Sequence, residues 1–297
     1  MNNIYKVLLF ILVLIVVDTA IGFSLNRLYL NSLYGIYGRQ IEALDDFNDD
    51  LLILGSSRAA HHYNPEIFEE ELNLSAFNAG SDGMCIYYHY AILNHIIHSQ
   101  DKPKIILLDV IALDVAKSTG ATFSLEAALN RLKPHYGKSN MVDELFSDIK
   151  WNEKIALSSS MYRYNSQILQ ILSSNFISDN NYKGYSPLYK TQEINKIVVA
   201  EDEIIIDELK LSYLTKTIQL CLSHNIPLIL CYSPSTIKPN ENFIRVIEEL
   251  SLKYGVPFYN LFTENIQKYS FQDDTHLNAK GADIFTKDLI SLLPTIR

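Results

Sequence analysis

Short apolar runs alternate with longer amphipathic stretches from about residue 50 to the carboxyl terminus. Apolar runs of four to seven residues bounded by turn residues are typical of buried strands in a parallel sheet. Stretches with apolar residues three and four positions apart predict helices with one buried face. This alternation predicts an α/β fold, with a five-stranded parallel sheet and helices on both faces. The expected strands end at Leu54, Ala79, Val110, Tyr232 and Leu261, and the main expected helices are Pro65–Leu74, Gly83–His98, Trp151–Leu172, Leu209–Ser223, Asn240–Tyr254 and Asn278–Leu293.

The amino-terminal segment has a different pattern. Val7–Phe23 is almost wholly apolar and is broken only by Asp18. Extended to Leu25, a helix here would be roughly 28 Å long, close to the ~30 Å core of a bilayer. A cleaved signal peptide is the alternative, because Ala20-Ile21-Gly22 fits a small-x-small cleavage site. The length of the apolar run favours an uncleaved transmembrane anchor, with the large domain outside the cytoplasm, in the periplasm or at the cell surface.

These patterns divide the chain into three parts. Residues 1–25 are the expected transmembrane anchor, residues 26–48 a partly helical linker that lifts the domain off the membrane, and residues 49–297 one α/β domain. Within that domain, residues 115–205 interrupt the alternation of strands and helices and form an expected helical insertion. Insertions of this kind often roof the site of an α/β enzyme.

The first expected strand ends in Gly-Ser-Ser-Arg, residues 55–58. In open α/β sheets, ligands bind at the carboxyl ends of the strands. Ser57 would therefore stand on a tight turn with its hydroxyl exposed at that edge. The alternative is that Ser56 and Ser57 only cap the helix that follows.

A second signal lies just before the last expected helix, where Asp273 and His276 share one loop. A serine nucleophile needs a general base, which is usually histidine. The histidine needs a carboxylate that fixes its tautomer, and an Asp three residues away can bend back to reach it. Loop aspartates more often cap turns, and a lone histidine is more often structural. The two signals together, at opposite ends of the domain, predict a triad of Ser57, His276 and Asp273.

Three segments resemble the conserved blocks of one family. Leu52-Ile53-Leu54-Gly55-Ser56-Ser57 resembles a first block, with Ser56 where many members carry Asp; Phe77-Asn78-Ala79-Gly80-Ser81-Asp82-Gly83 resembles a second; and Asp273-x-x-His276 resembles the last. The family is the SGNH (GDSL-like) hydrolases, and the resemblance spans about residues 50–293 with a long unmatched middle. The Gly-Ser-Ser-Arg variant is most similar to the membrane-anchored acyltransferase and esterase branch of envelope polysaccharide O-acetylation.

The resemblance implies a three-layer α/β/α, flavodoxin-like fold with Ser57, Asp273 and His276 as catalytic residues. It implies an oxyanion hole formed by the N–H groups of Ser57 and Gly83, with Gly80 as second choice. Gly83 is also expected at the start of a helix, where unpaired N–H groups favour an oxyanion. The family's third donor, an asparagine after the third strand, is missing, and Asp109 occupies that region. Arg58, Gly80 and Asp109 are candidates for substrate contact.

The expected function is that of a serine-dependent acyl ester hydrolase or O-acyltransferase, acting outside the cytoplasm on cell-envelope polysaccharide. An acylated carbohydrate or another ester is the expected substrate, and a membrane-bound O-acyltransferase is a candidate partner. The alternative is a non-catalytic protein of the same fold that binds a polysaccharide or that acyltransferase. A solute-binding domain shares the sheet but gives no reason for the Asp-His loop.

The composition of the chain argues against several kinds of partner, cross-link and cofactor. The net charge of −9 argues against nucleic acid as a partner, because phosphate binding favours a basic surface. Three cysteines are too few, and odd in number, for a disulfide framework. Zinc-ligand spacings and Gly-rich phosphate loops are absent from the sequence, so we expect neither a metal nor a cofactor.

Overall fold

A computed structural model describes residues 2–99, 101–118, 120–194, 196–199 and 204–293. A five-stranded sheet in the order β2-β1-β3-β5-β7 forms its centre, and every pair of neighbouring strands is parallel. The predicted α/β class and the five parallel strands are confirmed. A separate two-stranded sheet pairs β4 with β6. The strands are β1 Leu51–Gly55, β2 Ala76–Asn78, β3 Ile105–Asp109, β4 Val198–Val199, β5 Leu228–Tyr232, β6 Ile237–Lys238 and β7 Phe258–Asn260.

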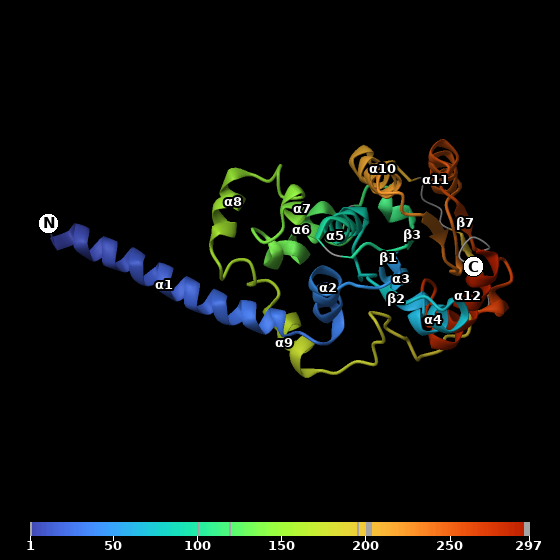
Figure 1. The fold of residues 1–297 in the computed structure, drawn as a ribbon, viewed down its shortest axis with the longest axis horizontal. Helices are drawn as coiled ribbons and strands as arrows, with labels where there is room; N and C mark the ends of the chain where they lie inside the picture. Colours follow the sequence, from blue (N-terminus) through green and yellow to red (C-terminus); the bar gives the residue numbers. More distant parts are fainter. Residues whose placement is uncertain (1, 100, 119, 195, 200–203, 294–297) are drawn as a thin grey trace.

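Helices cover both faces of the five-stranded sheet because successive strand residues point to opposite sides. Leu52 and Leu54 belong to a core cluster that includes residues of α5, α10 and α11, whereas Leu51 and Ile53 belong to a second cluster with α12. The central strands are therefore buried on both sides, which explains their continuous apolar sequence. Figure 1 shows α5, α10 and α11 on one side of the sheet and α4 and α12 on the other. The helices of this core are α3 Ser57–His62, α4 Pro65–Leu72, α5 Ile86–Ser99, α10 Glu208–Ser223, α11 Glu241–Tyr254 and α12 Ala279–Leu292.

Local sequence explains where several of these helices begin. The side chains of Asn64, Asp207 and Asn278 accept hydrogen bonds from backbone N–H groups in the first turns of α4, α10 and α12. Such caps satisfy donors that the helix itself leaves unpaired. Gly255, with φ of 67°, ends α11 in the left-handed conformation that glycine adopts without strain.

The amino-terminal helix α1, Asn2–Leu30, extends away from the rest of the molecule (Figure 1). It is long and apolar enough to cross a membrane, by length and composition. Its side chains from Ile4 to Val17 are all exposed. Beyond Gly22 one side of the helix packs against the domain, with Leu25 and Tyr29 buried.

The predicted linker over residues 26–48 is wrong, because most of this segment is part of the folded domain. It contains the end of α1 and helix α2, Gly35–Asp45. Tyr29 and Tyr37 are buried in a cluster with Tyr164 and Ile171, and the Tyr29 hydroxyl lies 2.7 Å from His135 Nε2. The segment therefore fixes α1 to the domain instead of separating them.

The insertion also differs from its prediction. Trp151–Leu172, expected as one helical stretch, forms two helices separated by turns over residues 159–167. The helices of the insertion pack against α1, α2 and α5. The part that approaches Ser57's edge of the sheet is extended chain, where the Ser186 N–H donates to the Ala60 carbonyl. The helices are α6 Leu125–Leu132, α7 Asn140–Glu144, α8 Trp151–Ser158 and α9 Ile168–Phe176.

Candidate active site

Ser57 is the first residue of α3, directly after the tight turn that ends β1. Gly55 has φ of 141°, and a Cβ there would lie 2.7 Å from the Asp109 carbonyl oxygen and 2.8 Å from Ala59 Cβ. Only glycine fits this close approach of strand and helix. Ser56 occupies the N-cap position but makes no capping hydrogen bond with its side chain. The alternative that these serines serve as side-chain caps is therefore not supported.

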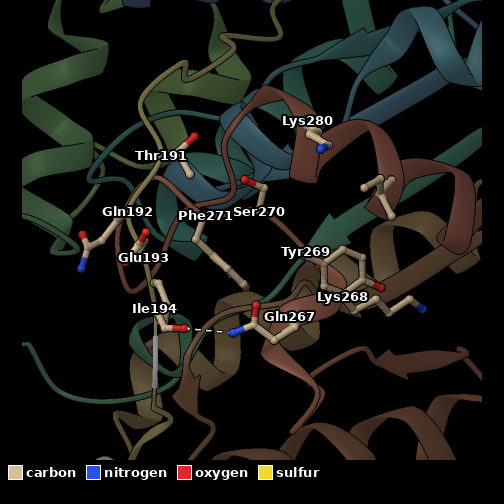
Figure 2. A pocket seen from close by; sticks show the side chains of 11 residues that line it. Thr191, Gln192, Glu193, Ile194, Gln267, Lys268, Tyr269, Ser270, Phe271 and Lys280 are labelled. Carbon is tan, nitrogen blue, oxygen red and sulfur yellow. Dashed lines mark hydrogen bonds between the residues drawn. The ribbon is translucent and has the colours of Figure 1, made fainter.

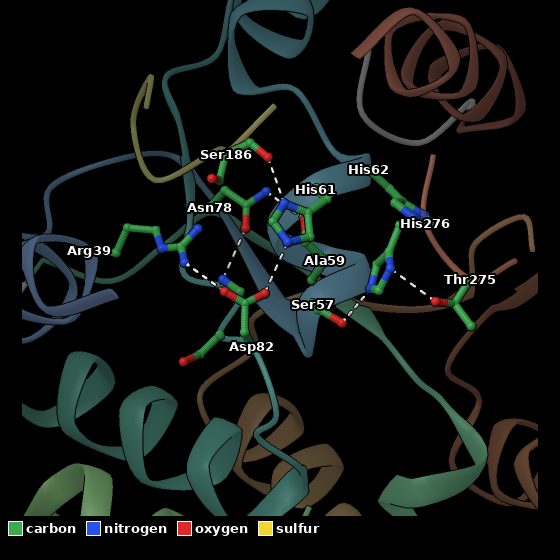
Figure 3. A network of polar contacts seen from close by, with 12 residues as sticks. Arg39, Ser57, Ala59, His61, His62, Asn78, Asp82, Ser186, Thr275 and His276 are labelled. Atoms are coloured by element: carbon green, nitrogen blue, oxygen red, sulfur yellow. Dashed lines mark hydrogen bonds and ion pairs between the residues drawn. The ribbon is translucent and has the colours of Figure 1, made fainter. Parts of the chain in front are cut away.

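Ser57, His276 and Asp273 form a continuous chain of hydrogen bonds. Ser57 Oγ lies 2.8 Å from His276 Nε2, and His276 Nδ1 lies 2.9 and 3.0 Å from the two carboxylate oxygens of Asp273. Because a carboxylate only accepts hydrogen bonds, we assign the imidazole proton to Nδ1, which leaves the Nε2 lone pair facing the serine hydroxyl. Figure 3 shows the Ser57 and His276 side chains pointing toward one another. The structure thus brings together the three residues that the sequence singled out.

Asp273 is held as a carboxylate by several donors. Its Oδ1 accepts hydrogen bonds of 2.9 Å from the N–H groups of Thr275 and His276 and from the Thr275 hydroxyl. Partial burial raises the pKa of Asp273, but these hydrogen bonds and its interaction with His276 outweigh burial and lower the pKa below its usual value. The carboxylate is therefore charged near neutral pH and oriented toward the imidazole.

The loop that carries Asp273 and His276 is anchored on both sides. The Gln272 N–H donates to the His276 carbonyl at 2.8 Å, closing the loop on itself. The Leu277 N–H donates to the buried His62 Nε2 at 2.9 Å. Asn278, the cap of α12, donates from its side chain to Ser270 Oγ. These contacts fix the position of the imidazole relative to α3.

The two candidate oxyanion glycines differ in their surroundings. The Gly80 N–H donates to Asn78 Oδ1 at 2.9 Å, so this group is already engaged. Gly83, with φ of 72°, lies in a turn before α5. The helix predicted to begin at Gly83 begins three residues later, at Ile86, so Gly83 is not at a helix N-terminus. Within the described part of the chain, no hydrogen bond uses the N–H of Gly83 or of Ser57. The Ser81 N–H donates to the Gly55 carbonyl at 3.0 Å, which ties this loop to the turn before Ser57.

The proposed substrate contacts of Arg58, Gly80 and Asp109 are not supported, because all three residues are buried and engaged internally. Asp109 is inaccessible and accepts hydrogen bonds from the Tyr63 hydroxyl at 2.6 Å and the Ser233 N–H at 3.1 Å. Arg58 donates to Ser233 Oγ and to the Ser233 carbonyl, and its Nε lies 3.7 Å from Asp109 Oδ1. Arg58 and Asp109 therefore stabilise the structure around the turn between β1 and α3.

His61 and His62 are the last two residues of α3. His62 is fully buried. His61 does lie beside the triad, with its ring centroid 5.5 Å from that of His276. Its Nε2 lies 3.0 Å from Asp82, and its Nδ1 lies 2.6 Å from the Ser186 carbonyl oxygen. His61 stands four residues after Ser57, a helical spacing that places the two on one side of α3 and that could have flagged it.

Asp82 and Arg39 complete this neighbouring network, and no sequence pattern indicated that they would pair. Asp82 Oδ2 accepts a hydrogen bond from Arg39 Nη2 at 3.3 Å, and Asp82 Oδ1 lies 3.0 Å from His61 Nε2 (Figure 3). Burial raises the pKa of Asp82, but the hydrogen bond from His61 and the charges of Arg39, His61 and Arg131 hold it well below its usual value. A charged pair therefore lies next to the triad.

A pocket of about 450 Å³ adjoins the Asp-His loop at Ser270 and Phe271 (Figure 2). It is bordered mainly by polar side chains, and Gln267 Nε2 donates to the Ile194 carbonyl at 3.3 Å. Ser57, Asp273 and His276 do not line it, so this pocket is distinct from the triad.

Among the described residues, no group of three or more His, Cys, Asp or Glu side chains is arranged to hold a metal ion. At the site, Ser57 supplies a hydroxyl, His276 an imidazole and Asp273 a carboxylate. Comparisons with protein-family models and with curated proteins find no match for this chain.

Proposed function

We propose that this protein is a serine-dependent acyl ester hydrolase or O-acyltransferase of the SGNH type. The observation that carries the proposal is the 2.8 Å contact between Ser57 Oγ and His276 Nε2, continued at 2.9 Å from His276 Nδ1 to Asp273. A serine, a histidine and a carboxylate in this order act as nucleophile, general base and orienting group on unrelated folds.

In the first half-reaction, Ser57 Oγ attacks the carbonyl carbon of an ester while His276 Nε2 takes the hydroxyl proton. The imidazolium that forms is stabilised by the Asp273 carboxylate. The tetrahedral intermediate then collapses, and the bond to the leaving alcohol breaks as His276 returns the proton to that oxygen. The product of this step is an acyl ester on Ser57.

In the second half-reaction, water or a sugar hydroxyl attacks the acyl carbon and gives its proton to His276. Collapse releases the acid or the new ester, and the proton returns to Ser57 Oγ. In both intermediates the negative oxygen accepts hydrogen bonds from the N–H groups of Ser57 and Gly83, which have no other partner in the described part of the chain. Removing one such donor from an enzyme typically costs on the order of 10²–10³ in rate.

The length and apolar composition of α1 support a location at the membrane. We further propose that the domain lies outside the cytoplasm and that a cell-envelope polysaccharide is its acceptor or substrate. Comparing the O-acyl content of surface glycan with and without the protein distinguishes transfer to or removal from glycan.

The test is hydrolysis of 4-nitrophenyl acetate by Ser57→Ala and Ser56→Ala variants. Ser57→Ala is expected to reduce turnover to the rate of buffer alone. Ser56→Ala is a matched control, because Ser56 Oγ is buried and has no hydrogen-bond partner among the described residues. Loss of activity in both variants, or in neither, would reject Ser57 as the nucleophile.

Asp109 favours a second candidate function, a non-catalytic protein that binds polysaccharide or a membrane acyltransferase. The family's third oxyanion donor is replaced there by an acceptor that is committed to Tyr63, Ser233 and Arg58. A fluorophosphonate probe separates the two functions. Covalent labelling that requires Ser57 supports the enzyme, whereas an unlabelled, folded protein supports the binding role.

A further inference from the structure

Helix α8 presents apolar side chains to solvent at the edge of the insertion. Trp151 is 75% exposed and Ile155 is 60% exposed, and their spacing of four residues places them on one side of the helix. Leu157 is buried in the core and anchors the other side. An exposed tryptophan beside an exposed isoleucine on an anchored helix is unusual for a surface that faces only water.

The turn that follows α8 is held against α1 at Asp18. Asp18, inside the apolar run of α1, accepts hydrogen bonds from Ser159 Oγ at 2.5 Å, from the Ser160 N–H at 2.8 Å and from the Met161 N–H at 3.1 Å. A Cβ on Gly22 would lie 2.2 Å from Ser160 Cβ, so the two segments are in close contact. In Figure 1, α8 forms the edge of the domain on the side toward which α1 extends.

The length of the apolar part of α1 then determines how far the bilayer extends along the helix toward the domain. Ile4–Val17, the exposed run before Asp18, is about 21 Å long at about 1.5 Å per residue. A bilayer core of ~30 Å requires about 20 residues, so its edge falls roughly 9 Å beyond Val17. Phe23 is 65% exposed and Ile21 is 41% exposed, which keeps the free side of α1 apolar past Asp18.

The bilayer that surrounds α1 therefore reaches the level at which the chain after α8 is attached. We propose that α8 is a second membrane-contacting element, which inserts Trp151 and Ile155 into the leaflet on the domain side. Tryptophan favours the boundary between hydrocarbon and headgroups. Lys150 and Lys154 are also exposed on this helix, and their ammonium groups suit the phosphates of that boundary.

The bilayer is favoured over a protein partner because its presence follows from α1 itself. If α1 spans the membrane, lipid is already adjacent to the contact between Asp18 and the turn that follows α8. The contact would give the domain a second attachment to the membrane, which limits how far α1 and the domain can tilt together. This inference does not depend on the chemistry proposed for Ser57.

The test uses the full-length chain in lipid nanodiscs, with one protein per disc. Trp151 is the only tryptophan in the sequence, so it reports its own surroundings. Discs made with chain-brominated phosphatidylcholine should quench its emission strongly compared with unbrominated discs. The emission should also be blue-shifted and protected from aqueous acrylamide.

The matched control is a Trp151→Phe/Leu252→Trp variant. Leu252 is 84% exposed on α11, which lies at the end of the molecule away from α1 (Figure 1). Its tryptophan should be open to acrylamide and unaffected by bromine. Two results would overturn the proposal: Trp151 emission that matches this control, or a blue shift without bromine quenching, which would mean that protein covers α8 instead of lipid.

Discussion

His62 Nε2 accepts a hydrogen bond of 2.9 Å from the backbone N–H of Leu277, the residue that follows His276. His62 ends α3, the helix that begins with Ser57. This one bond therefore joins the helix of the nucleophile to the loop of the base. Burial lowers the pKa of His62 well below its usual value, so the ring is neutral and its Nε2 is free to accept. Its Nδ1 lies 2.9 Å from Ser233 Oγ.

Replacing His62 tests whether this bond positions His276. In His62→Leu the Leu277 N–H loses its acceptor, and we expect kcat for ester hydrolysis to fall on the order of tenfold, equivalent to about 1.4 kcal/mol, with KM little changed. His62→Gln can present an acceptor oxygen near the position of Nε2 and should recover part of the rate. Equal kcat in both variants would mean that the bond does not control the position of the base.

Replacing Asp273 tests the orientation of the imidazole. The amide of Asp273→Asn cannot stabilise the imidazolium and favours the wrong tautomer, so we expect kcat to fall by on the order of 10⁴. Asp274→Asn is the matched control, because Asp274 is exposed and accepts only from Thr236 among the described residues. Steady-state hydrolysis by the two variants measures the difference, and a similar rate for both would argue against Asp273 as the orienting carboxylate.

The strands and the triad could be predicted because their signals are local. A buried strand such as β1 must be apolar at every position, and Ser57, Asp273 and His276 each follow or precede a recognisable element. What brings Ser57 and His276 together is the parallel sheet, whose strands end at one edge. Sequence alone could name the residues but could not measure the 2.8 Å between them.

The errors have a common cause, which is contact between segments distant in the chain. The Arg39–Asp82 pair could not be predicted, because the two residues are 43 positions apart and only tertiary packing brings them together. Trp151–Leu172 divides into two helices where Asp18, more than a hundred residues earlier, accepts hydrogen bonds from the intervening turn. The linker prediction over residues 26–48 failed because the sequence does not reveal that Tyr29 and Tyr37 have tertiary partners.

The Arg58–Asp109 pair should be important for stability. Both side chains are buried, and Arg58→Met would leave the Asp109 carboxylate without its cation. Breaking a buried pair in this way costs roughly 3–5 kcal/mol of the free energy of unfolding. Denaturant unfolding should show that Arg58→Met/Asp109→Asn is less destabilised than the sum of the single variants, because the double variant leaves no buried charge.

The exposed Arg245 on α11 provides the control for this series. Its guanidinium donates to Asn242 of the same helix, and Arg245→Met should change the free energy of unfolding by less than about 0.5 kcal/mol. A similarly small change for Arg58→Met would show that Asp109 does not need its partner.

Stability should also fall as pH decreases below about 6.5, the usual pKa of histidine. Burial lowers the pKa of His62 well below that value and lowers those of His89 and His135 to about 3. At pH 5 to 6 the unfolded chain therefore binds protons at these histidines that the folded chain does not, which favours unfolding. Asp114 acts in the opposite direction, because burial raises its pKa to about 7 and the folded chain keeps its proton.

We expect these three buried histidines to outweigh Asp114, so that the free energy of unfolding decreases by on the order of 2 kcal/mol per pH unit between pH 6 and pH 5. His89→Leu isolates one contribution, because within the described residues neither His89 ring nitrogen has a hydrogen-bond partner to lose. Removing this histidine should reduce the slope by on the order of 1 kcal/mol per pH unit. Denaturant unfolding of the detergent-solubilised chain at pH 5, 6 and 7 measures both slopes. An unchanged slope in His89→Leu would mean that His89 is protonated in the folded chain, and that its ring shares a charge with Asp114, 3.9 Å away.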